Sequence, residues 1–371
     1  MKKVMIIFGT RPEAIKLCPI ILELRKFPKI FNVVVCVTGQ HKEMLEQVLR
    51  TFNVTPEYDL KLMKNNQSLF KLTSSGLIKI GEVLEKENPN IVLVQGDTTT
   101  TFTAALAAFY RKIPVAHVEA GLRSGNNYSP FPEEMNRKIA SLITKYHFAP
   151  TELNKNNLIR EGINKDSIFI TGNTVIDSLL WVKEKIRREK IVYEQLKNIN
   201  FNKNIILVTG HRRENFGIKL DNICHALKYI ANNYDVEIVY PVHLNPNVKK
   251  HVYSILNNIN NIKLIPPLDY EPFVYLMDKC TLIITDSGGI QEEAPTFRKP
   301  ILITRDVTER KEVIDNGSAF LVGSDVKNIL IKVHSLMNNR KYYNNIRNIS
   351  NPYGDGKSSK KIVNILKYLD M

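Results

Sequence analysis

Short apolar runs alternate with amphipathic segments nearly from one end of the chain to the other. Most of these runs are continuous rather than alternating, which is typical of strands buried on both faces of a parallel sheet. The pattern predicts strands at Val4–Phe8, Val33–Thr38, Ile91–Val94, Val115–Val118, Ile168–Ile170, Ile205–Thr209, Glu237–Tyr240, Lys263–Ile265, Leu282–Thr285 and Ile301–Ile303. Between them it predicts helices such as Pro12–Phe27, Lys42–Thr51, Leu69–Glu87 and Thr99–Tyr110. This order of elements predicts an α/β fold built from doubly wound parallel sheets.

The strand–helix pattern restarts near Asn202, after a long charged segment, roughly Val175–Asn198, that predicts a helix. A chain of 371 residues also exceeds what one hydrophobic core usually supports. We therefore expect two Rossmann-like domains with a cleft between them, formed by residues 1–172 and 173–355. A last amphipathic helix over 357–369 suggests that residues 356–371 cross back and complete the first domain.

Composition and charge narrow the class of ligand. The apolar content of 43% and the charged content of 24% are ordinary for a globular enzyme. The net charge of +15 comes from lysines dispersed along the chain rather than from one basic face. Such a dispersed field favours an anionic small molecule over nucleic acid, so no nucleic-acid partner is expected.

Cysteine usage and the N-terminus bear on the compartment. The cysteines are far apart, without metal-ligand spacing or a disulfide framework: Cys18, Cys36, Cys224 and Cys280. This usage fits a reducing compartment and predicts neither a metal nor a disulfide. Arg11 and Glu13 interrupt the N-terminal apolar run too early for a signal peptide. No apolar run approaches the ~20 residues of a membrane span, so we expect a cytoplasmic protein without a membrane partner.

The segment Thr285–Glu293 follows an apolar strand and opens a helix. Gly288 and Gly289 would let a ligand approach the backbone closely, and the N–H groups of a helix start attract an anion. Glu293 lies one turn into that helix, where a carboxylate could accept hydrogen bonds from two sugar hydroxyls. The segment is a candidate nucleotide site, although a capped turn with two solvated acids would show the same pattern.

Two cations follow the first predicted strand. Arg11 and Lys16 lie near the start of a helix in which Pro12 suits the first turn. Cations at this position oppose the helix dipole, so the pair indicates an anionic ligand. A solvated surface pair is the alternative interpretation.

Acidic residues follow the later strands of the first half. Asp97 follows the third strand and is either an N-cap or a site residue. Glu119 directly follows an apolar strand, where an unpaired acid would be costly, so a specific partner is expected. Glu133 suits the first turn of a helix on electrostatic grounds alone. Three carboxylates converging beside these cations and Arg123 would suit proton transfer.

Histidines follow two strands of the second half. His211 is followed by two arginines after the strand Ile205–Thr209, which is typical of an anion or proton-transfer site. We interpret His243, in another loop, as a structural residue. His41, in the first half, is ambiguous from its sequence context.

Seven segments in order resemble the non-hydrolysing UDP-N-acetylglucosamine 2-epimerase family over nearly the whole chain. They are Phe8–Lys16, Gly96–Thr101, His117–Arg123, Ser129–Glu134, Thr171–Asp177, Thr209–Glu214 and Asp286–Pro295. Each motif alone is weak, whereas all of them at compatible spacing are specific. The resemblance implies a GT-B fold and interconversion of UDP-N-acetylglucosamine and UDP-N-acetylmannosamine without a cofactor. It also implies elimination of UDP to a 2-acetamidoglucal, re-addition at C2, and a homodimer.

The resemblance assigns roles to the residues found above. Asp97, Glu119 and Glu133 become the acid–base candidates, because a proton must leave one face of C2 and return to the other. His211 becomes a further catalytic residue. His211, Asp97 and Glu119 are all implied to contact the substrate. The groups implied for UDP are Arg11, Lys16, Ser287, Gly288, Gly289 and Arg310 for the diphosphate, Glu293 for ribose, and Phe273 with the backbone beside Leu268 for uracil.

The resemblance also implies a second, allosteric site for UDP-N-acetylglucosamine at Gln40, His41 and Gln67. Some positions depart from the family pattern, and at Leu268 the change leaves only backbone atoms to read the base. Three alternatives stay open on the same fold: a hydrolysing epimerase that releases N-acetylmannosamine and UDP, a glycosyltransferase that needs an acceptor, and a sugar-nucleotide-binding regulator without catalysis.

Overall fold

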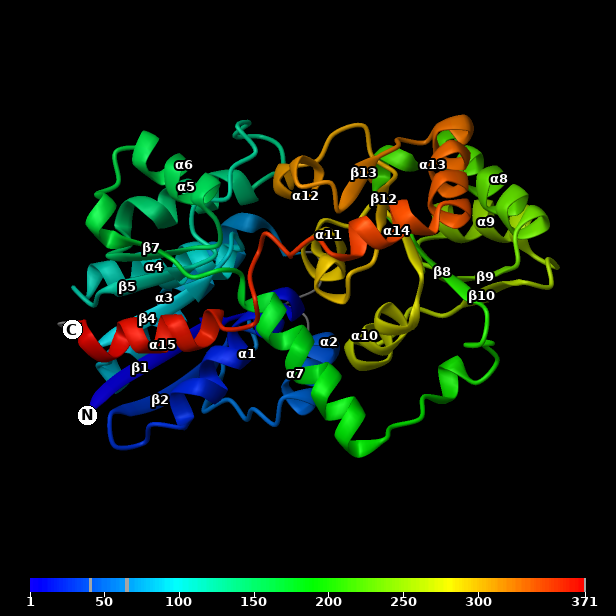
Figure 1. Ribbon diagram of the computed structural model, residues 1–371. Helices are drawn as coiled ribbons and strands as arrows, with labels where there is room; N and C mark the ends of the chain where they lie inside the picture. The colour runs from blue at the N-terminus through cyan, green and yellow to red at the C-terminus, as the bar shows by residue number, and fades with distance from the viewer. Residues whose placement is uncertain (40–41, 64–66, 370–371) are drawn as a thin grey trace. The chain divides into compact units, whose positions relative to one another are not determined.

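The computed structural model describes residues 1–39, 42–63 and 67–369 of the chain. The chain folds into two compact units, one formed by Met1–Trp181 with Tyr353–Met371 and the other by Val182–Pro352 (Figure 1). Each unit contains a parallel sheet flanked by helices, which confirms the predicted α/β class of GT-B type. The domain boundaries at 172/173 and 355/356 stay predictions.

The first unit is built on a 7-stranded sheet of order β3-β2-β1-β4-β5-β6-β7. The strands are β1 Lys2–Phe8, β2 Phe31–Val37, β3 Tyr58–Asp59, β4 Ile91–Gln95, β5 Val115–Val118, β6 Tyr146–Ala149 and β7 Ile168–Ile170. The chain proceeds outward from β1 in one direction and from β4 in the other. The boundary between these two strands is therefore a topological switch point, where ligands bind in doubly wound sheets.

Helices cover both faces of this sheet, as its continuous apolar strands require. They are α1 Arg11–Arg25, α2 Lys42–Thr51, α3 Leu69–Glu87, α4 Thr99–Tyr110, α5 Glu133–Ile143, α6 Glu152–Arg160, the first half of α7 Thr174–Glu189, and α15 Ser358–Tyr368. Met5 and Ile7 of β1 pack in one apolar cluster with Ile80 of α3 and Ala104 of α4. Helix α1 packs against α2 and α15, and Figure 1 shows α15, in red, beside α1.

The C-terminal helix is fastened to the first unit at both ends. Lys2 Nζ donates hydrogen bonds to the carbonyl oxygens of Leu366, Lys367 and Leu369 at 3.2, 2.8 and 2.7 Å. Such a cation at a helix C-terminus satisfies carbonyls that have no partner within the helix. At the other end, the buried Asp177 carboxylate of α7 accepts from the backbone N–H groups at the start of α15, and burial raises its pKa.

The second unit contains a 6-stranded parallel sheet of order β10-β9-β8-β11-β12-β13. Its strands are β8 Asn204–Thr209, β9 Val236–Pro241, β10 Ile262–Ile265, β11 Leu282–Thr285, β12 Ile301–Ile303 and β13 Ala319–Leu321. Its helices are α8 Ile218–Asn233, α9 Pro246–Leu256, α10 Tyr270–Lys279, α11 Gly288–Glu293, α12 Lys311–Asp315, α13 Val326–Asn338 and α14 Arg340–Arg347. Its switch point lies between β8 and β11.

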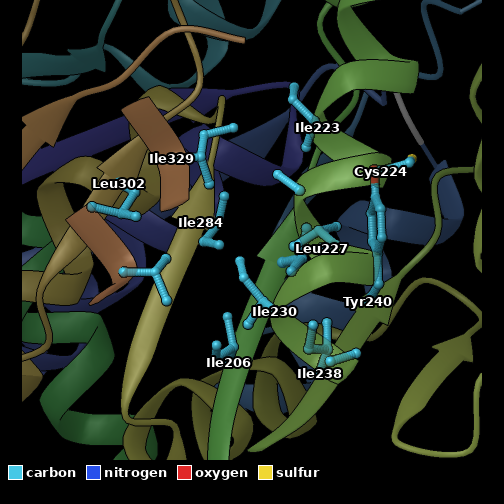
Figure 2. Close-up of a cluster of buried hydrophobic side chains, with 14 of the residues drawn as sticks. Ile206, Ile223, Cys224, Leu227, Ile230, Ile238, Tyr240, Ile284, Leu302 and Ile329 are labelled. Carbon is cyan, nitrogen blue, oxygen red and sulfur yellow. The ribbon is translucent and has the colours of Figure 1, made fainter. Parts of the chain in front are cut away.

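One apolar cluster holds this second sheet to its helices. Figure 2 shows Leu227 and Ile230 of α8 beside Ile206 of β8 and Ile238 of β9. Tyr240 of β9 belongs to the same cluster and is buried. Its hydroxyl group donates to the Gly210 carbonyl oxygen at 3.4 Å, so the core also supports the loop that follows β8.

The elements differ from the sequence-based prediction in two ways. Strands β3, β6 and β13 were not predicted, because two are short edge strands and β6 contains a histidine and a tyrosine. Helix α7 ends at Glu189 rather than Asn198, because Lys190 adopts a left-handed conformation with φ of 49°. Among the described residues, no helix is long and apolar enough to cross a membrane, and the cysteines are buried free thiols.

Two glycines in the loop after β5 provide a matched test of packing in the first unit. Both Gly121 and Gly125 have positive φ, at 88° and 81°. A Cβ added at Gly121 would overlap the Asn154 carbonyl oxygen, whereas a Cβ at Gly125 meets nothing within 4 Å. We expect Gly125→Ala to cost about 1 kcal/mol for the backbone conformation alone. Gly121→Ala adds a steric overlap and should cost roughly 3 kcal/mol or more.

Urea unfolding followed by Trp181 fluorescence measures this difference in the first unit. Trp181 is the one tryptophan of the chain, and its ring lies 4.7 Å from that of Phe52 between centroids. Equal losses of stability in the two variants would contradict the packing that we describe at Gly121.

Candidate active site

Glu119 follows β5 directly and is held by two donors. Lys16 of α1 forms an ion pair with Glu119 Oε2, and Asn173 Nδ2 donates to the same oxygen at 2.9 Å. The two side chains of the ion pair are only 13% and 8% exposed, so solvent screens it weakly. Glu119 also has φ of 65°, a conformation that costs a non-glycine residue about 1–2 kcal/mol. Strain of this kind is typical of functional positions.

Asp97 follows β4 and pairs with an arginine that the sequence did not indicate. The N-cap of α4 is Thr98, whose hydroxyl accepts from Thr101 N at 3.1 Å, so the alternative that Asp97 is the cap is wrong. Asp97 Oδ2 instead forms an ion pair with Arg137 of α5. Burial by itself would lower the pKa of Arg137, but the combined attraction and hydrogen bonds of Asp97 and Glu134 raise it.

The adjacent acids Glu133 and Glu134 have different environments at the start of α5. Glu134 is buried and accepts from Ser124 N at 3.0 Å and Arg137 Nη1 at 2.7 Å. Although burial disfavours its charge, these hydrogen bonds lower the pKa of Glu134. Glu133 Oε2 is buried and forms no hydrogen bond within residues 1–39, 42–63 and 67–369. Glu134 therefore organises the loop, whereas Glu133 keeps an oxygen that no donor among these described residues uses.

Glu13 ties the loop after β1 to the start of α4. Its Oε2 accepts from Gly9 N at 3.0 Å and Thr10 N at 2.8 Å. Its Oε1 accepts from the Thr98 hydroxyl at 2.7 Å. Glu13 is 1% exposed, and burial raises its pKa in spite of these donors. Arg11, two residues earlier, is half-buried and makes no ion pair in the described part of the chain.

In the second unit, Asp286 organises the loop that carries His211. Asp286 follows β11, is fully buried, and accepts from His211 N and Arg212 N at 2.9 Å each. Its Oδ1 lies 3.3 Å from His211 Nδ1. The imidazole ring also stacks on His243, at 5.7 Å between centroids and 22° between planes. His243, interpreted as a structural loop residue, is thus an immediate neighbour of the predicted catalytic histidine.

Arg310 lies directly against the start of α11. A Cβ added at Gly288 would stand 3.0 Å from Arg310 Cζ and 3.1 Å from Nη1. Arg310 Nε donates to the buried Glu292 carboxylate at 2.9 Å, which fixes the guanidinium in place. Gly289 is open, with Ser287 Oγ at 4.0 Å from its Cβ position. Ser287 is the N-cap of α11, and within the described chain its side chain makes no cap bond.

The acids around Arg310 form a network. Glu309 Oε2 lies 3.4 Å from Arg310 Nη1 and 3.0 Å from Arg305 Nη1. Burial opposes the charge of Glu309, but the hydrogen bonds from Arg305 lower its pKa to about 2. The carboxylate therefore stays ionised, and it keeps both guanidinium groups oriented at the end of β12.

The structure places the remaining predicted residues as follows. Glu293, at the end of α11, is 8% exposed. Phe273 lies on α10 and Leu268 just before it, both half-buried. Gln67 precedes α3, whereas Gln40 and His41 lie outside the described residues.

The structure brings three predicted residues to one edge of the first sheet but leaves Arg123 apart from them. Asp97, Glu119 and Lys16 all lie at the carboxyl edge of the first sheet, but Arg123 pairs with Glu161 at 2.6 Å instead of joining them. Arg137 of α5, rather than Arg123, is the arginine that pairs with Asp97. The sequence feature that could have indicated Arg137 is its spacing of three residues from Glu134, which places both side chains on one face of a helix. Among the described residues, no group of three or more His, Cys, Asp or Glu side chains could hold a metal ion.

Two doubly wound sheets, with ion-paired carboxylates in one unit and a glycine turn beside Arg310 in the other, define an α/β protein of GT-B type. A family model described as UDP-N-acetylglucosamine 2-epimerase matches residues 23–367. The chain therefore belongs to the UDP-N-acetylglucosamine 2-epimerase family, which is a family of isomerases. The family predicted from the sequence motifs is confirmed.

Individual relatives are similar over nearly their whole length. A Campylobacter jejuni UDP-N-acetylglucosamine 2-epimerase is 53% identical over 99% of this chain and 97% of its own. The solved Neisseria meningitidis UDP-GlcNAc 2-epimerase, bound to UDP-GlcNAc, is 49% identical with a TM-score of 0.90 and covers 98% of this chain and 99% of its own. An S. aureus protein in a UDP co-structure is 43% identical with a TM-score of 0.88, covering 99% and 96%.

A buried histidine beneath the Asp97 loop predicts a pH dependence of stability. His117 of β5 is 1% exposed, and its Nε2 donates to the Gly96 carbonyl oxygen at 2.7 Å. Burial lowers its pKa to about 3, so the folded protein keeps this ring neutral. Below about pH 6.5 the unfolded chain binds a proton that the folded chain does not, so stability falls as the pH falls from about 6.5 to about 3.

We expect His117→Gln, which keeps an N–H donor but does not titrate, to remove this contribution. Between pH 7 and pH 5 the wild type should lose about 2 kcal/mol more stability than the variant. Urea unfolding by Trp181 fluorescence at both pH values gives the difference directly. Parallel losses in the two proteins would show that His117 is not the titrating group.

Proposed function

We propose that the protein interconverts UDP-N-acetylglucosamine and UDP-N-acetylmannosamine by epimerisation at C2, without hydrolysis and without a cofactor. Membership of the family supports the substrate class. The observation that carries the reaction type is the set of carboxylates in the first unit. Glu119 is paired with Lys16, Asp97 is paired with Arg137, and Glu133 has a buried oxygen that no donor of the described chain uses.

The proposed reaction has two steps that balance without a redox partner. In the first, a carboxylate takes the C2 proton as the C1–O bond breaks, and the electron pair of that bond leaves with the β-phosphate oxygen of UDP. The organic intermediate is a 2-acetamidoglucal. In the second, UDP adds back to C1 and an acid delivers a proton to the opposite face of C2. Because the two proton transfers occur on opposite faces, more than one acid–base group is needed.

We assign the leaving group to residues that hold fixed positive charge. Arg310 and the start of α11 at Ser287, Gly288 and Gly289 would bind the diphosphate, because preorganised donors stabilise charge that develops during bond breaking. Arg11 and Lys16 would supply further cations. Glu293 would bind ribose, and Phe273 with the backbone at Leu268 would bind uracil.

His211 is the proposed catalytic residue of the second unit, in contact with substrate. The Asp286 carboxylate lies beside Nδ1 and fixes the ring, as carboxylates commonly do for catalytic histidines. The remaining parts of the proposal are inferred from the family resemblance alone. They are a cytoplasmic homodimer, a second UDP-N-acetylglucosamine site at Gln40, His41 and Gln67, and a product that supplies cell-surface polysaccharide.

The decisive experiment is turnover of UDP-N-acetylglucosamine in deuterium oxide, followed by NMR. We expect UDP-N-acetylmannosamine with deuterium at C2, since the acid that delivers the second proton carries deuterium from the solvent. Free N-acetylmannosamine with UDP would show a hydrolysing enzyme, and turnover only after addition of an acceptor would show a glycosyltransferase. Asp97→Asn, Glu119→Gln and Glu133→Gln should each bind UDP yet lose about 100-fold or more in kcat. Wild-type rates in all three would overturn the acid–base assignment.

The two glycines of the α11 start separate the role of Arg310 from that of the turn itself. In Gly288→Ala the new methyl group would displace the Arg310 guanidinium, so UDP affinity should fall roughly tenfold or more. In Gly289→Ala the methyl group enters open space in the protein alone, so Arg310 stays in place. Calorimetric titration of both variants with UDP compares them. A smaller loss in Gly288→Ala than in Gly289→Ala would show that Arg310 does not bind the diphosphate.

A further inference from the structure

Asn173 connects three segments of the first unit that are distant in sequence. It is 3% exposed and immediately precedes α7. Its Nδ2 donates to Glu119 Oε2 at 2.9 Å, and its Oδ1 accepts from Val175 N at 3.1 Å in the first turn of α7. Its backbone N–H donates to the Tyr353 carbonyl oxygen at 2.7 Å.

The chain leaves the first unit along the helix that starts after Asn173, and it returns at a residue that is hydrogen-bonded to Asn173. Helix α7 carries the chain out of the first unit after Trp181, and Tyr353 is the first residue to return. The neighbouring Gly172 has φ of 85°, and a Cβ there would stand 2.6 Å from Ser358 Oγ. The returning segment is thus packed tightly against the backbone that presents the Asn173 side chain.

We propose that Asn173 is a positioning residue for Glu119, setting the direction of its carboxylate for proton transfer. This inference rests on the proposed acid–base role of Glu119. Lys16 and Asn173 both contact Oε2, while Oε1 lies toward Gly96, 4.0 Å from the Cβ position of that glycine. Gly96 opens the loop that carries Asp97, so with both donors on Oε2 the other oxygen of Glu119 lies toward that loop.

The chemistry of the amide matters as well as its position. Glu119 forms its ion pair with Lys16 from α1, and the neighbouring loop after β4 carries Asp97 with its own partner Arg137 from α5. Asn173 adds a donor from the α7 side without adding a charge. An aspartate in its place could still cap α7, but it would set a second carboxylate at hydrogen-bond distance from Glu119. Two carboxylates so close share a proton, and ionising both needs a higher pH.

The test compares Asn173→Asp with Asn164→Asp in the epimerisation assay. Asn164 makes the same kind of cap bond, with its Oδ1 accepting from Asp166 N at 3.0 Å, but it is exposed and lies outside the candidate site. We expect Asn173→Asp to lower kcat by about tenfold or more with KM changed less than about threefold. The acid limb of its kcat/KM profile should move up by about one pH unit. Asn164→Asp should leave the rate and the pH profile of the wild type unchanged.

A second variant keeps the inference testable if Asn173→Asp folds poorly. Asn173→Ser retains a cap acceptor and the backbone N–H but is too short to donate to Glu119. It should lose kcat without a shift of the acid limb, at a melting temperature near that of the wild type. If a folded Asn173 variant keeps the wild-type kcat and pH profile, this inference is overturned, but the proposed function is not. Absence of epimerisation by the wild type would overturn the proposed function, and this inference with it.

Discussion

The parallel pairing of β1 with β4 is the constraint on which the first unit depends. Val4, Met5 and Ile6 pair with Ile91, Val92 and Leu93, although nearly ninety residues separate the two strands in the chain. All these side chains are buried, so a shift of register would expose apolar surface on one face or the other. Because the strands are parallel, their carboxyl ends meet at one edge, and that edge receives the loops with Arg11 and Asp97.

Burial then determines how the acids at this edge behave. A carboxylate taken from water must be compensated by donors or cations, and the site meets this requirement in different ways. Glu13 and Glu134 accept several backbone or hydroxyl hydrogen bonds, to which Arg137 adds one at Glu134, and they hold loops together. Asp97 and Glu119 each have a cation as partner. A reaction that moves protons can use acids such as Asp97 and Glu119, because rearranging one ion pair disturbs the fold less than losing several loop hydrogen bonds.

Much of this was predictable from the sequence, and the exceptions have physical reasons. Continuous apolar strands such as Ile91–Val94 were predicted within a residue, because burial on both faces leaves an unambiguous pattern. Strand β3 contains two residues and carries no such pattern. Among the site residues, Glu119 was identified because an acid after a buried strand is costly without a partner. Arg137 and Asn173 were not, because only the fold shows which acid a distant donor reaches.

The hydrogen bonds of the loops after the first strands bear on where a phosphate is proposed to bind. In many doubly wound folds, the backbone N–H groups of the loop after the first strand bind phosphate. Here, in the first unit, Glu13 accepts from Gly9 N and Thr10 N. In the second unit, Asp286 accepts from His211 N and Arg212 N after β8.

Both first loops thus donate to internal carboxyl groups, which occupy the N–H donors that a phosphate would need at the same place. The start of α11 differs, because within the described chain Ser287 makes no side-chain cap bond and the Arg310 guanidinium, itself paired with Glu292 and Glu309, lies against Gly288. In both first loops the backbone N–H groups bond to a buried acid. A ligand at these loops would therefore meet side chains, namely Arg11 in the first unit and His211 in the second. This arrangement supports the proposal that the diphosphate binds at the α11 turn, where a helix start lies beside a guanidinium group.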